Sequence, residues 1–268
     1  MGRPLIASDV TGANRRFYDR IAAVYDRVDS RRGGKVDHGW IDRVLGAAVE
    51  SVVAGTGRPA EALEFLDVGA GSGFLAERAR RHVGRITLLD LSRPMLERIA
   101  LAGARRIQAD ACRLPLRDAS MDFVGAFATL HHLYEPAPLF EEAFRVLRPG
   151  GLLYCDHDIE EAFARRFRVP LRLYRALFDH GHRYLRHCPE ASARDYSLSE
   201  FHGERGLPLG AMADRLREIG FEVVQARAHW EGMGALAHVI ERLGLARILS
   251  DPGWSPVGRL IARKPGPR

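Results

Sequence analysis

Short apolar runs alternate with segments of helical spacing along the chain from residue 62 onward. The apolar runs predict strands at residues 62–68, 85–89, 107–109, 121–127, 152–155, 221–226 and 259–262. The segments between them predict helices at residues 74–81, from Pro94 onward, at 139–147 and at 212–219. Strands and helices in this alternation are typical of α/β proteins, so we expect a doubly wound, mostly parallel sheet of seven strands.

Three stretches do not fit this alternation. Residues 1–60 contain two apolar patterns of helical period, which predict an N-terminal helical lid. Residues 157–210 and 228–253 are also mainly helical in pattern, and the first of them predicts a cap inserted into the sheet domain. The expected organisation is a lid at 1–60, an α/β domain formed by 61–156 and 211–268, and a cap at 157–210 that carries substrate specificity.

The start of this cap is strongly amphipathic. Its apolar positions recur every three or four residues, at Phe163, Phe167, Leu171, Tyr174 and Phe178. A second stripe of the same spacing is basic and consists of Arg165, Arg168, Arg172 and Arg175. We expect Pro170 to kink or restart the helix. Three interpretations stay open for the basic stripe: contact with an anionic substrate, contact with lipid headgroups, or a solvated face.

A glycine-rich loop follows the first predicted strand, in the sequence Leu66-Asp-Val-Gly-Ala-Gly-Ser-Gly-Phe74. Glycines at alternate positions permit positive φ angles and a close approach of a ligand to the main chain. A nicotinamide-type loop would require G-x-G-x-x-G, but here the third glycine comes one residue early and Phe74 stands at the last glycine position. The loop alone therefore indicates a nucleotide-like ligand without specifying it.

Acidic residues end the next two predicted strands. Asp90 ends the second strand, where a carboxylate can accept from both ribose hydroxyls of an adenosine, and Asp110 ends the third, where it can accept from an adenine amine. A proline-glycine turn, Arg148-Pro149-Gly150-Gly151, leads into the fifth strand. Since parallel sheets bind ligands at the carboxyl ends of their strands, these residues predict an adenosine-containing cofactor.

On these motifs the chain resembles the class I S-adenosylmethionine-dependent methyltransferases, which have a Rossmann-like fold. The resemblance is close over about residues 62–156 and looser over 211–263. Two further segments, Phe17-Tyr-Asp-Arg-Ile-Ala-Ala-Val-Tyr-Asp26 and Ala128-Thr-Leu-His-His-Leu133, are similar to the small-molecule group that includes the quinone C-methyltransferases. The resemblance implies S-adenosylmethionine as cofactor.

The resemblance also implies which residues bind that cofactor. Gly69, Gly71 and Gly73 would approach the methionine moiety, with Asp67 at its ammonium group. Asp90 would hold the ribose, Asp110 and Ala111 the adenine, and Tyr25 would help to close the site. The implied cofactor-binding set is completed by Ala70, Leu91, Met95 and Phe127.

Methyl transfer needs a general base only when the acceptor must lose a proton. Candidates for that base are His131 and His132 after the fourth strand and His157 after the fifth; the histidine pair could instead only shape the pocket. Asp156-His157-Asp158 resembles a metal-ligand cluster, but successive residues of a strand point to opposite faces, so only the two aspartates could converge. We therefore expect no metal.

Composition narrows the remaining classes. The chain has 40 basic and 34 acidic residues, for a net charge of +6, and 46% hydrophobic residues. No stretch approaches the roughly 18 apolar residues of a membrane span, and the N-terminus lacks a signal-peptide core. Three widely spaced cysteines indicate neither a disulfide framework nor a zinc knuckle. We therefore expect a cytoplasmic protein with free thiols.

The excess charge is concentrated in the cap. Residues 162–188 contain seven arginines and one acid, Asp179, while the rest of the chain has 33 basic and 33 acidic residues. We therefore expect a small organic acceptor, or a surface, with negative charge. The predicted activity is O-, N- or C-methylation of a small molecule, with methylation of a quinone ring carbon at a membrane surface as the alternative. RNA methylation is disfavoured because no nucleic-acid-binding module is evident, and a non-catalytic cofactor-binding protein stays open.

Overall fold

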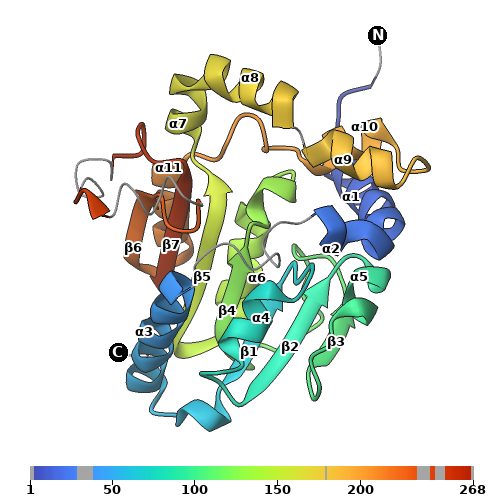
Figure 1. Ribbon diagram of the computed structural model, residues 1–268. Coiled ribbons are helices and arrows are strands. Elements are labelled where there is room, and N and C mark those ends of the chain that lie inside the picture. The colour runs from blue at the N-terminus through green and yellow to red at the C-terminus, as the bar shows by residue number, and fades with distance from the viewer. Residues whose placement is uncertain (1–2, 29–38, 179, 234–241, 245–250, 267–268) are drawn as a thin grey trace.

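The computed structural model describes residues 3–28, 39–178, 180–233, 242–244 and 251–266. Its centre is a sheet of seven strands in the order β3-β2-β1-β4-β5-β7-β6 (Figure 1). The strands are β1 Glu64–Val68, β2 Arg85–Asp90, β3 Arg105–Gln108, β4 Met121–Phe127, β5 Leu147–Ile159, β6 Glu222–His229 and β7 Val257–Arg263. Only β7 runs antiparallel to its neighbours β5 and β6. The predicted doubly wound, mostly parallel sheet is confirmed.

The strand order reverses between β1 and β4, and this position defines the site. β1 pairs with β2 on one side and with β4 on the other, so that Val68 lies beside Leu89 and Ala126. Side chains of β1 and β4 are buried on both faces, as the apolar runs that predicted them require. The carboxyl ends of β1, β2 and β4 therefore meet at one edge of the sheet, at the topological switch point.

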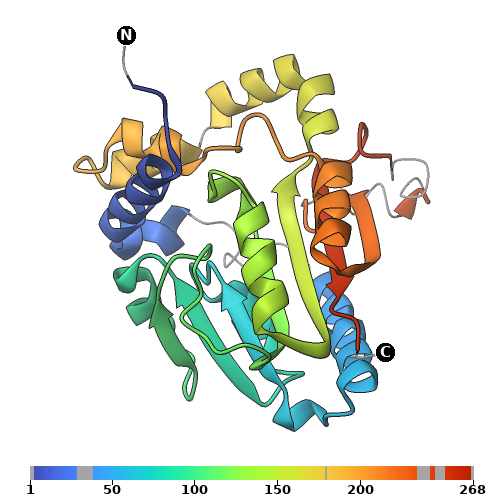
Figure 2. The ribbon, with the colours of Figure 1, turned by 180° about the vertical axis from the view of Figure 1, so that it is seen from behind.

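Helices cover both faces of the sheet. One face carries α3 Gly39–Thr56, α4 Phe74–Ala79 and α5 Arg93–Arg98, whose apolar residues share a core with β1, β2 and β4. The other face carries α6 Ala137–Val146 and α11 Leu209–Ile219, seen in front of the sheet in Figure 2. Helix α5 begins as expected: the side chain of the buried Ser92 accepts from the Met95 amide, and a proline stands in the first turn.

A third group of helices lies over the carboxyl ends of β1, β2 and β3. It combines α1 Ala7–Ile21, the turn Ala22–Val24 and α2 Tyr25–Val28 with α9 His180–His187 and α10 Ala193–Ser199 (Figures 1 and 2). The ring of Phe17 packs at 6.0 Å from Tyr184 and 5.2 Å from Tyr196. The helices of the expected lid, residues 1–60, therefore pack in two places. α1 and α2 pack against cap helices, whereas α3 packs on the sheet.

The cap begins later than the sequence predicts. β5 continues through His157 to Ile159, because Asp158 and Ile159 pair with Gly258 and Val257 of β7. The cap helices then begin with α7 Glu161–Arg166, followed by α8 Arg168–Phe178. The helix breaks at Phe167 and restarts with Pro170 in the first turn of α8, where proline is tolerated.

Several sequence expectations can be compared with the remaining described elements. No helix of the described residues is both long and apolar enough to cross a bilayer. Cys112, Cys155 and Cys188 are free. Residues 228–253 were expected to be mainly helical. Their first two residues belong to β6, which ends at His229, and most of residues 234–250 lie outside the described residues. Asp179 and the side chain of Phe178 also lie outside them.

Candidate active site

In the glycine loop between β1 and α4, every second residue has a left-handed backbone conformation. Gly69, Gly71 and Gly73 have φ angles of 66°, 52° and 81°. A Cβ at Gly69 would lie 2.5 Å from Thr129 Cγ2, and one at Gly73 would lie 2.6 Å from Ile99 Cγ2. A Cβ at Gly71 would make only ordinary van der Waals contacts, with the Gly69 carbonyl oxygen at 3.7 Å and Tyr25 Oη at 4.0 Å. Two glycines thus permit close packing, and Gly71 keeps the floor of a pocket free.

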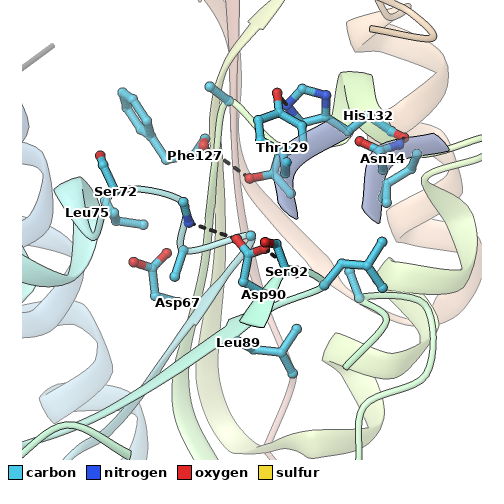
Figure 3. A pocket seen from close by; sticks show the side chains of 18 of the residues that line it. Asn14, Asp67, Ser72, Leu75, Leu89, Asp90, Ser92, Phe127, Thr129 and His132 are labelled. Carbon is cyan, nitrogen blue, oxygen red and sulfur yellow. Dashed lines mark hydrogen bonds between the residues drawn. The ribbon is translucent and has the colours of Figure 1, made fainter. Parts of the chain in front are cut away.

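Asp90, at the end of β2, holds this loop in place. Its Oδ2 accepts from the Gly71 amide at 2.9 Å and its Oδ1 accepts from the Ser92 amide at 2.8 Å. Figure 3 shows the carboxylate between the glycine loop and Ser92. Each carboxylate oxygen can accept a second hydrogen bond. Asp90 can therefore order the loop and still receive a diol.

Asp67, at the end of β1, is a buried carboxyl group beneath the same pocket. It is 2% exposed, and its Oδ2 accepts from the Ala76 amide at 3.1 Å. Within the described chain no basic side chain is paired with it. Burial raises the pKa of Asp67 to about 8; the Ala76 hydrogen bond opposes this rise and the charge of Asp90 adds to it. The pocket therefore holds an acid that a cationic ligand group would ionise.

Asp110 follows β3 at the third corner of the pocket. Its Oδ1 accepts from the Cys112 amide at 2.9 Å, which fixes the carboxyl group in a tight turn. Burial, and next the charge of Asp110, raise the pKa of Cys112 to about 12. Cys112 is therefore a neutral thiol and not a nucleophile.

One pocket collects most of the predicted cofactor-binding residues. Ten of them line it: Tyr25, Asp67, Gly69, Ala70, Gly71, Asp90, Leu91, Asp110, Ala111 and Phe127. Two of the predicted set do not line it. Gly73 packs against Ile99, and the Met95 side chain lies in the core beneath the lid together with Phe17 and Ile21. Both support the pocket from behind.

Sequence reasoning missed the contribution of α1 to this pocket. Thr11, Asn14 and Tyr18 line it from the lid side, and Figure 3 shows Asn14 beside His132. Asn14 is 8% exposed, and its Nδ2 donates to the carbonyls of Val10 at 3.1 Å and His132 at 2.9 Å. A polar residue inside an apolar helical stripe was the available signal, but its partner lies 118 residues away in sequence. The rest of the lining not predicted as cofactor-binding is Ser72, Phe74, Leu75, Leu89, Ser92, Ala109, Ala128, Thr129, His132 and Leu133.

The two histidines after β4 lie in the turn Leu130–His132 and differ in their partners. Asp158 Oδ1 accepts from the His131 amide at 3.0 Å and lies 2.7 Å from His131 Nδ1. His132 Nδ1 donates to the Ser199 carbonyl at 2.7 Å, and its Nε2 lies 3.3 Å from Tyr18 Oη. Burial, and next the neighbouring His131, lower the pKa of His132 to about 4. His132 is therefore neutral at pH 7, and it connects the lid to the cap.

His157 lies behind the pocket wall. Its ring stacks 4.4 Å from Phe127 and 5.1 Å from Trp40, and it is not among the pocket-lining residues. Its φ of 68° coincides with a bulge between Asp156 and Asp158 in the pairing with β7. Because the bulge breaks the alternation of the strand, Asp156 Oδ1 lies 3.2 Å from His157 Nδ1, while Asp158 turns to His131. The prediction that only the two aspartates could converge was wrong.

Asp156 belongs to a buried charge cluster. Its Oδ2 accepts from Tyr154 Oη at 2.7 Å and from Arg259 Nε at 2.6 Å, and its Oδ1 lies 2.8 Å from His229 Nε2. Burial favours the neutral acid, but His229 and Arg259 hold the pKa of Asp156 well below its usual range. Arg259 is 1% exposed and also reaches Glu231. This cluster ties β5, β6 and β7 together beside the site.

Two groups of side chains in the described residues have the composition of metal ligands. In the first, Asp156, His157 and His229, the carboxylate already binds the Arg259 guanidinium, which repels a cation. In the second, His131, His132 and Glu200, the two rings are engaged with Asp158 and the Ser199 carbonyl. The expectation of a metal-free site stays a prediction.

Comparison with known proteins agrees with this geometry. Residues 66–155 match the family model described as a methyltransferase domain. The chain is 32% identical over 146 residues to a demethylmenaquinone methyltransferase of Clavibacter sepedonicus, an alignment that covers 52% of this chain and 56% of the relative. It is 30% identical over 207 residues to a probable S-adenosylmethionine-dependent methyltransferase of Mycolicibacterium smegmatis, covering 71% of this chain and 66% of the relative.

The fold is shared with solved structures at lower identity. The [4+2]-cyclase SpnF superposes with a TM-score of 0.61 at 18% identity, over 99% of each chain. This likeness concerns the fold alone. The matched domain spans the glycine loop, Asp90 and Asp110, which are the residues that build the pocket. The chain therefore belongs to the class I S-adenosylmethionine-dependent methyltransferases and, within them, is similar to the quinone methyltransferases.

Proposed function

We propose that this protein binds S-adenosylmethionine and transfers its methyl group to a small organic acceptor. The observation that carries the proposal is the pocket itself: a left-handed glycine loop, with Asp67, Asp90 and Asp110 at three successive strand ends around it. When bound, the cofactor supplies an electrophilic sulfonium methyl group. The protein's task is then to orient the acceptor and to exclude water, which contributes up to about 7–11 kcal/mol to such reactions.

Each acidic residue fits one part of that cofactor. The buried Asp67 would receive the ammonium group, because a cation at this position relieves the cost of an unpaired buried carboxylate. Asp90 would accept from the ribose hydroxyls with the lone pairs that Gly71 and Ser92 leave free. Asp110 and Ala111 would border the adenine. Tyr25, near Gly71 and 6% exposed, would close the methionine end.

We assign the general base to His131 for acceptors that must lose a proton. His131 does not itself line the cofactor pocket, but it directly precedes His132, which does. Asp158 Oδ1 lies 2.7 Å from His131 Nδ1 and fixes the orientation of the ring, as a carboxylate does in hydrolase triads. His131 Nε2, which lies 3.6 Å from Glu200 Oε2, would take the proton of the acceptor. The acceptor's electron pair would form the new bond to the methyl carbon, and the bond from that carbon to sulfur would break, with its electron pair staying on a neutral thioether. His132, whose pKa is about 4, is a weaker base and would orient Tyr18 and the acceptor.

His157 would have a positioning role. Its ring supports Phe127, which lines the cofactor pocket, and Trp40 supports the ring from the other side. A substitution of His157 should therefore alter cofactor affinity rather than the pH dependence of the reaction. This role differs from the base function that sequence position alone suggests.

The acceptor is proposed to enter from the side of the lid and the cap, which lie over the carboxyl ends of the strands (Figure 1). The alternative acceptor is a quinone ring carbon, favoured by the similarity to demethylmenaquinone methyltransferases. The two relatives named above are matched over 56% and 66% of their own lengths, so the identity of the acceptor is part of the proposal.

Label transfer from methyl-tritiated S-adenosylmethionine tests this function. The purified protein is incubated with a small-molecule extract, with demethylmenaquinone in its reduced form, and with total RNA. Label in a small-molecule fraction supports the proposal, and label in the quinone fraction identifies the alternative acceptor. Label only in RNA, or cofactor binding without any transfer, contradicts it. A Gly71→Arg variant serves as the binding-deficient control.

A further inference from the structure

Helix α8 exposes an apolar stripe at the edge of the molecule. Val169 is 71% exposed, Leu173 63% and Leu177 67%, and Tyr174 beside them is 56% exposed. Four of the eleven exposed large hydrophobic residues of the described chain thus lie on this single helix. Scattered exposed apolar residues need no explanation, but a contiguous stripe of them marks a contact surface.

The helix presents this stripe away from the protein. Val169, Leu173 and Leu177 are spaced four residues apart and therefore share one face, which we call the outer face of α8. On the opposite side, Arg175 donates to the Gly203 carbonyl at 2.8 Å, and Leu171 is half-buried. Figures 1 and 2 both show α8 at the rim of the molecule, beyond the carboxyl ends of the central strands.

Helix α7 anchors this segment to the body. Phe163 is buried and packs 5.7 Å from Trp230, and Phe167 packs 5.8 Å from Trp254. Arg166 lies over the ring of Trp254 at 4.3 Å. Phe163 and Phe167, at the start of the predicted apolar stripe, therefore pack against the body of the protein. The apolar side chains of the outer face are instead exposed.

Exposed arginines flank the outer face. Arg168 and Arg172 form the neighbouring stripe of α8, and Arg165 and Arg166 precede it at the end of α7; all four are exposed. None of residues 162–178 is acidic. An apolar stripe bordered by arginines without acids is the pattern of helices that lie in the interface of an anionic bilayer.

We propose that the outer face of α8 binds the surface of an anionic lipid bilayer. Val169, Leu173 and Leu177 would enter the boundary between headgroups and acyl chains, and Arg168 and Arg172 would contact lipid phosphates. A second copy of the chain fits this surface less well, because two such helices would bring their arginine stripes together without any acid between them.

The bilayer would then lie on the side of the sheet that carries the cofactor pocket. This placement suits an acceptor dissolved in the lipid. That role of the bilayer rests on the proposed methyl transfer. The binding itself depends only on α8. Residues of the outer face are separate from the pocket, so their substitution should leave cofactor binding unchanged.

Vesicle flotation of the full-length protein tests this inference. We expect at least tenfold tighter binding to vesicles of equal phosphatidylcholine and phosphatidylglycerol than to phosphatidylcholine alone, in 0.1 M salt. Leu173→Gln combined with Leu177→Gln should weaken binding at least tenfold. Arg168→Gln combined with Arg172→Gln should remove most of the preference for anionic lipid, since each surface charge contributes about fivefold. Val224→Gln, at a 52% exposed apolar residue of β6, is the matched control and should bind as the wild type does.

The proposal is overturned if the wild type does not bind anionic vesicles, or if the leucine double variant binds them equally well. It is also overturned if sedimentation velocity shows dimerisation that the leucine variant abolishes, because a second copy would then cover the face. Titration with S-adenosylhomocysteine in the absence of lipid separates this outcome from the proposed function. A protein that binds vesicles but not the nucleoside would refute only the methyl transfer.

Discussion

Replacing Asp67 by Asn should stabilise the free protein while removing its affinity for the cofactor. The carboxyl group is 2% exposed, and in the free protein its polar partner is the Ala76 amide at 3.1 Å. An asparagine has the same shape and keeps an oxygen for that amide. The substitution therefore removes the buried acid without opening a cavity.

The expected size of the effect depends on pH. The pKa of Asp67 rises from 3.8 to about 8 in the folded protein. The unfolded chain ionises near 3.8, so the native state loses stability relative to it as the pH rises from about 4 to about 8. At about 1.4 kcal/mol for each pH unit, the upper limit of this loss is about 6 kcal/mol above pH 8. Because buried sites relax and admit water, we expect Asp67→Asn to gain about 2 kcal/mol at pH 8.5.

Thermal unfolding between pH 4 and pH 8.5 measures this gain. For a chain of this size, about 2 kcal/mol corresponds to an increase of roughly 4–8 °C in Tm. The gain should shrink toward zero near pH 4, where both states of the wild type are protonated. In the same variant, affinity for S-adenosylhomocysteine should fall about 10- to 100-fold, since a charge-assisted hydrogen bond to the ammonium is lost. A variant that is less stable at pH 8.5, or whose gain does not change with pH, would refute this account of Asp67.

Three further predictions follow from the site. Arg259→Met should lower the stability by about 3–5 kcal/mol, because Asp156 is left as a buried unpaired charge, and adding Asp156→Asn should restore most of it in denaturant unfolding. His131→Asn should reduce kcat about 100-fold or more for a protic acceptor, with the affinity for S-adenosylhomocysteine unchanged. Asp158→Asn should also reduce kcat, because the His131 ring loses the carboxylate that orients it. An unchanged kcat in His131→Asn would remove His131 as the base, and His187→Ala, at an exposed site, is the control. Asn14→Ala should weaken S-adenosylhomocysteine up to about tenfold by faster dissociation, seen in stopped-flow binding, because the lid loses its bond to the His132 carbonyl; equal dissociation rates would contradict this.

The cofactor side of the site was readable from sequence because it is local. The glycine loop follows β1, Asp90 ends β2 and Asp110 lies two residues after β3, and parallel pairing brings the ends of these strands to one edge. Alternation of apolar runs located all seven strands for the same reason. Such features depend on a few neighbouring residues and on the geometry of a parallel sheet.

The features that were missed depend on contacts between distant residues. Asn14 lines the pocket only because α1 packs against the turn that holds His132, and no local pattern encodes that pairing. β5 continues past its apolar run because its polar end pairs with β7. The bulge at His157 moved Asp158 to His131, which alternation along the strand could not predict. Similarly, the outer face of α8 has a clear helical period, but its exposure follows from the anchoring of α7.

Calorimetric titration with S-adenosylhomocysteine tests the central claim most directly. The wild type should bind one equivalent, and Gly71→Arg should not, because the arginine side chain would enter the pocket that Gly71 and Tyr25 both line. Gly103→Arg provides the matched control: Gly103 also has a left-handed φ, of 79°, faces open space and lies outside the pocket lining. The account predicts that this control binds like the wild type. An absence of binding by the wild type, or equal binding by Gly71→Arg, would contradict it.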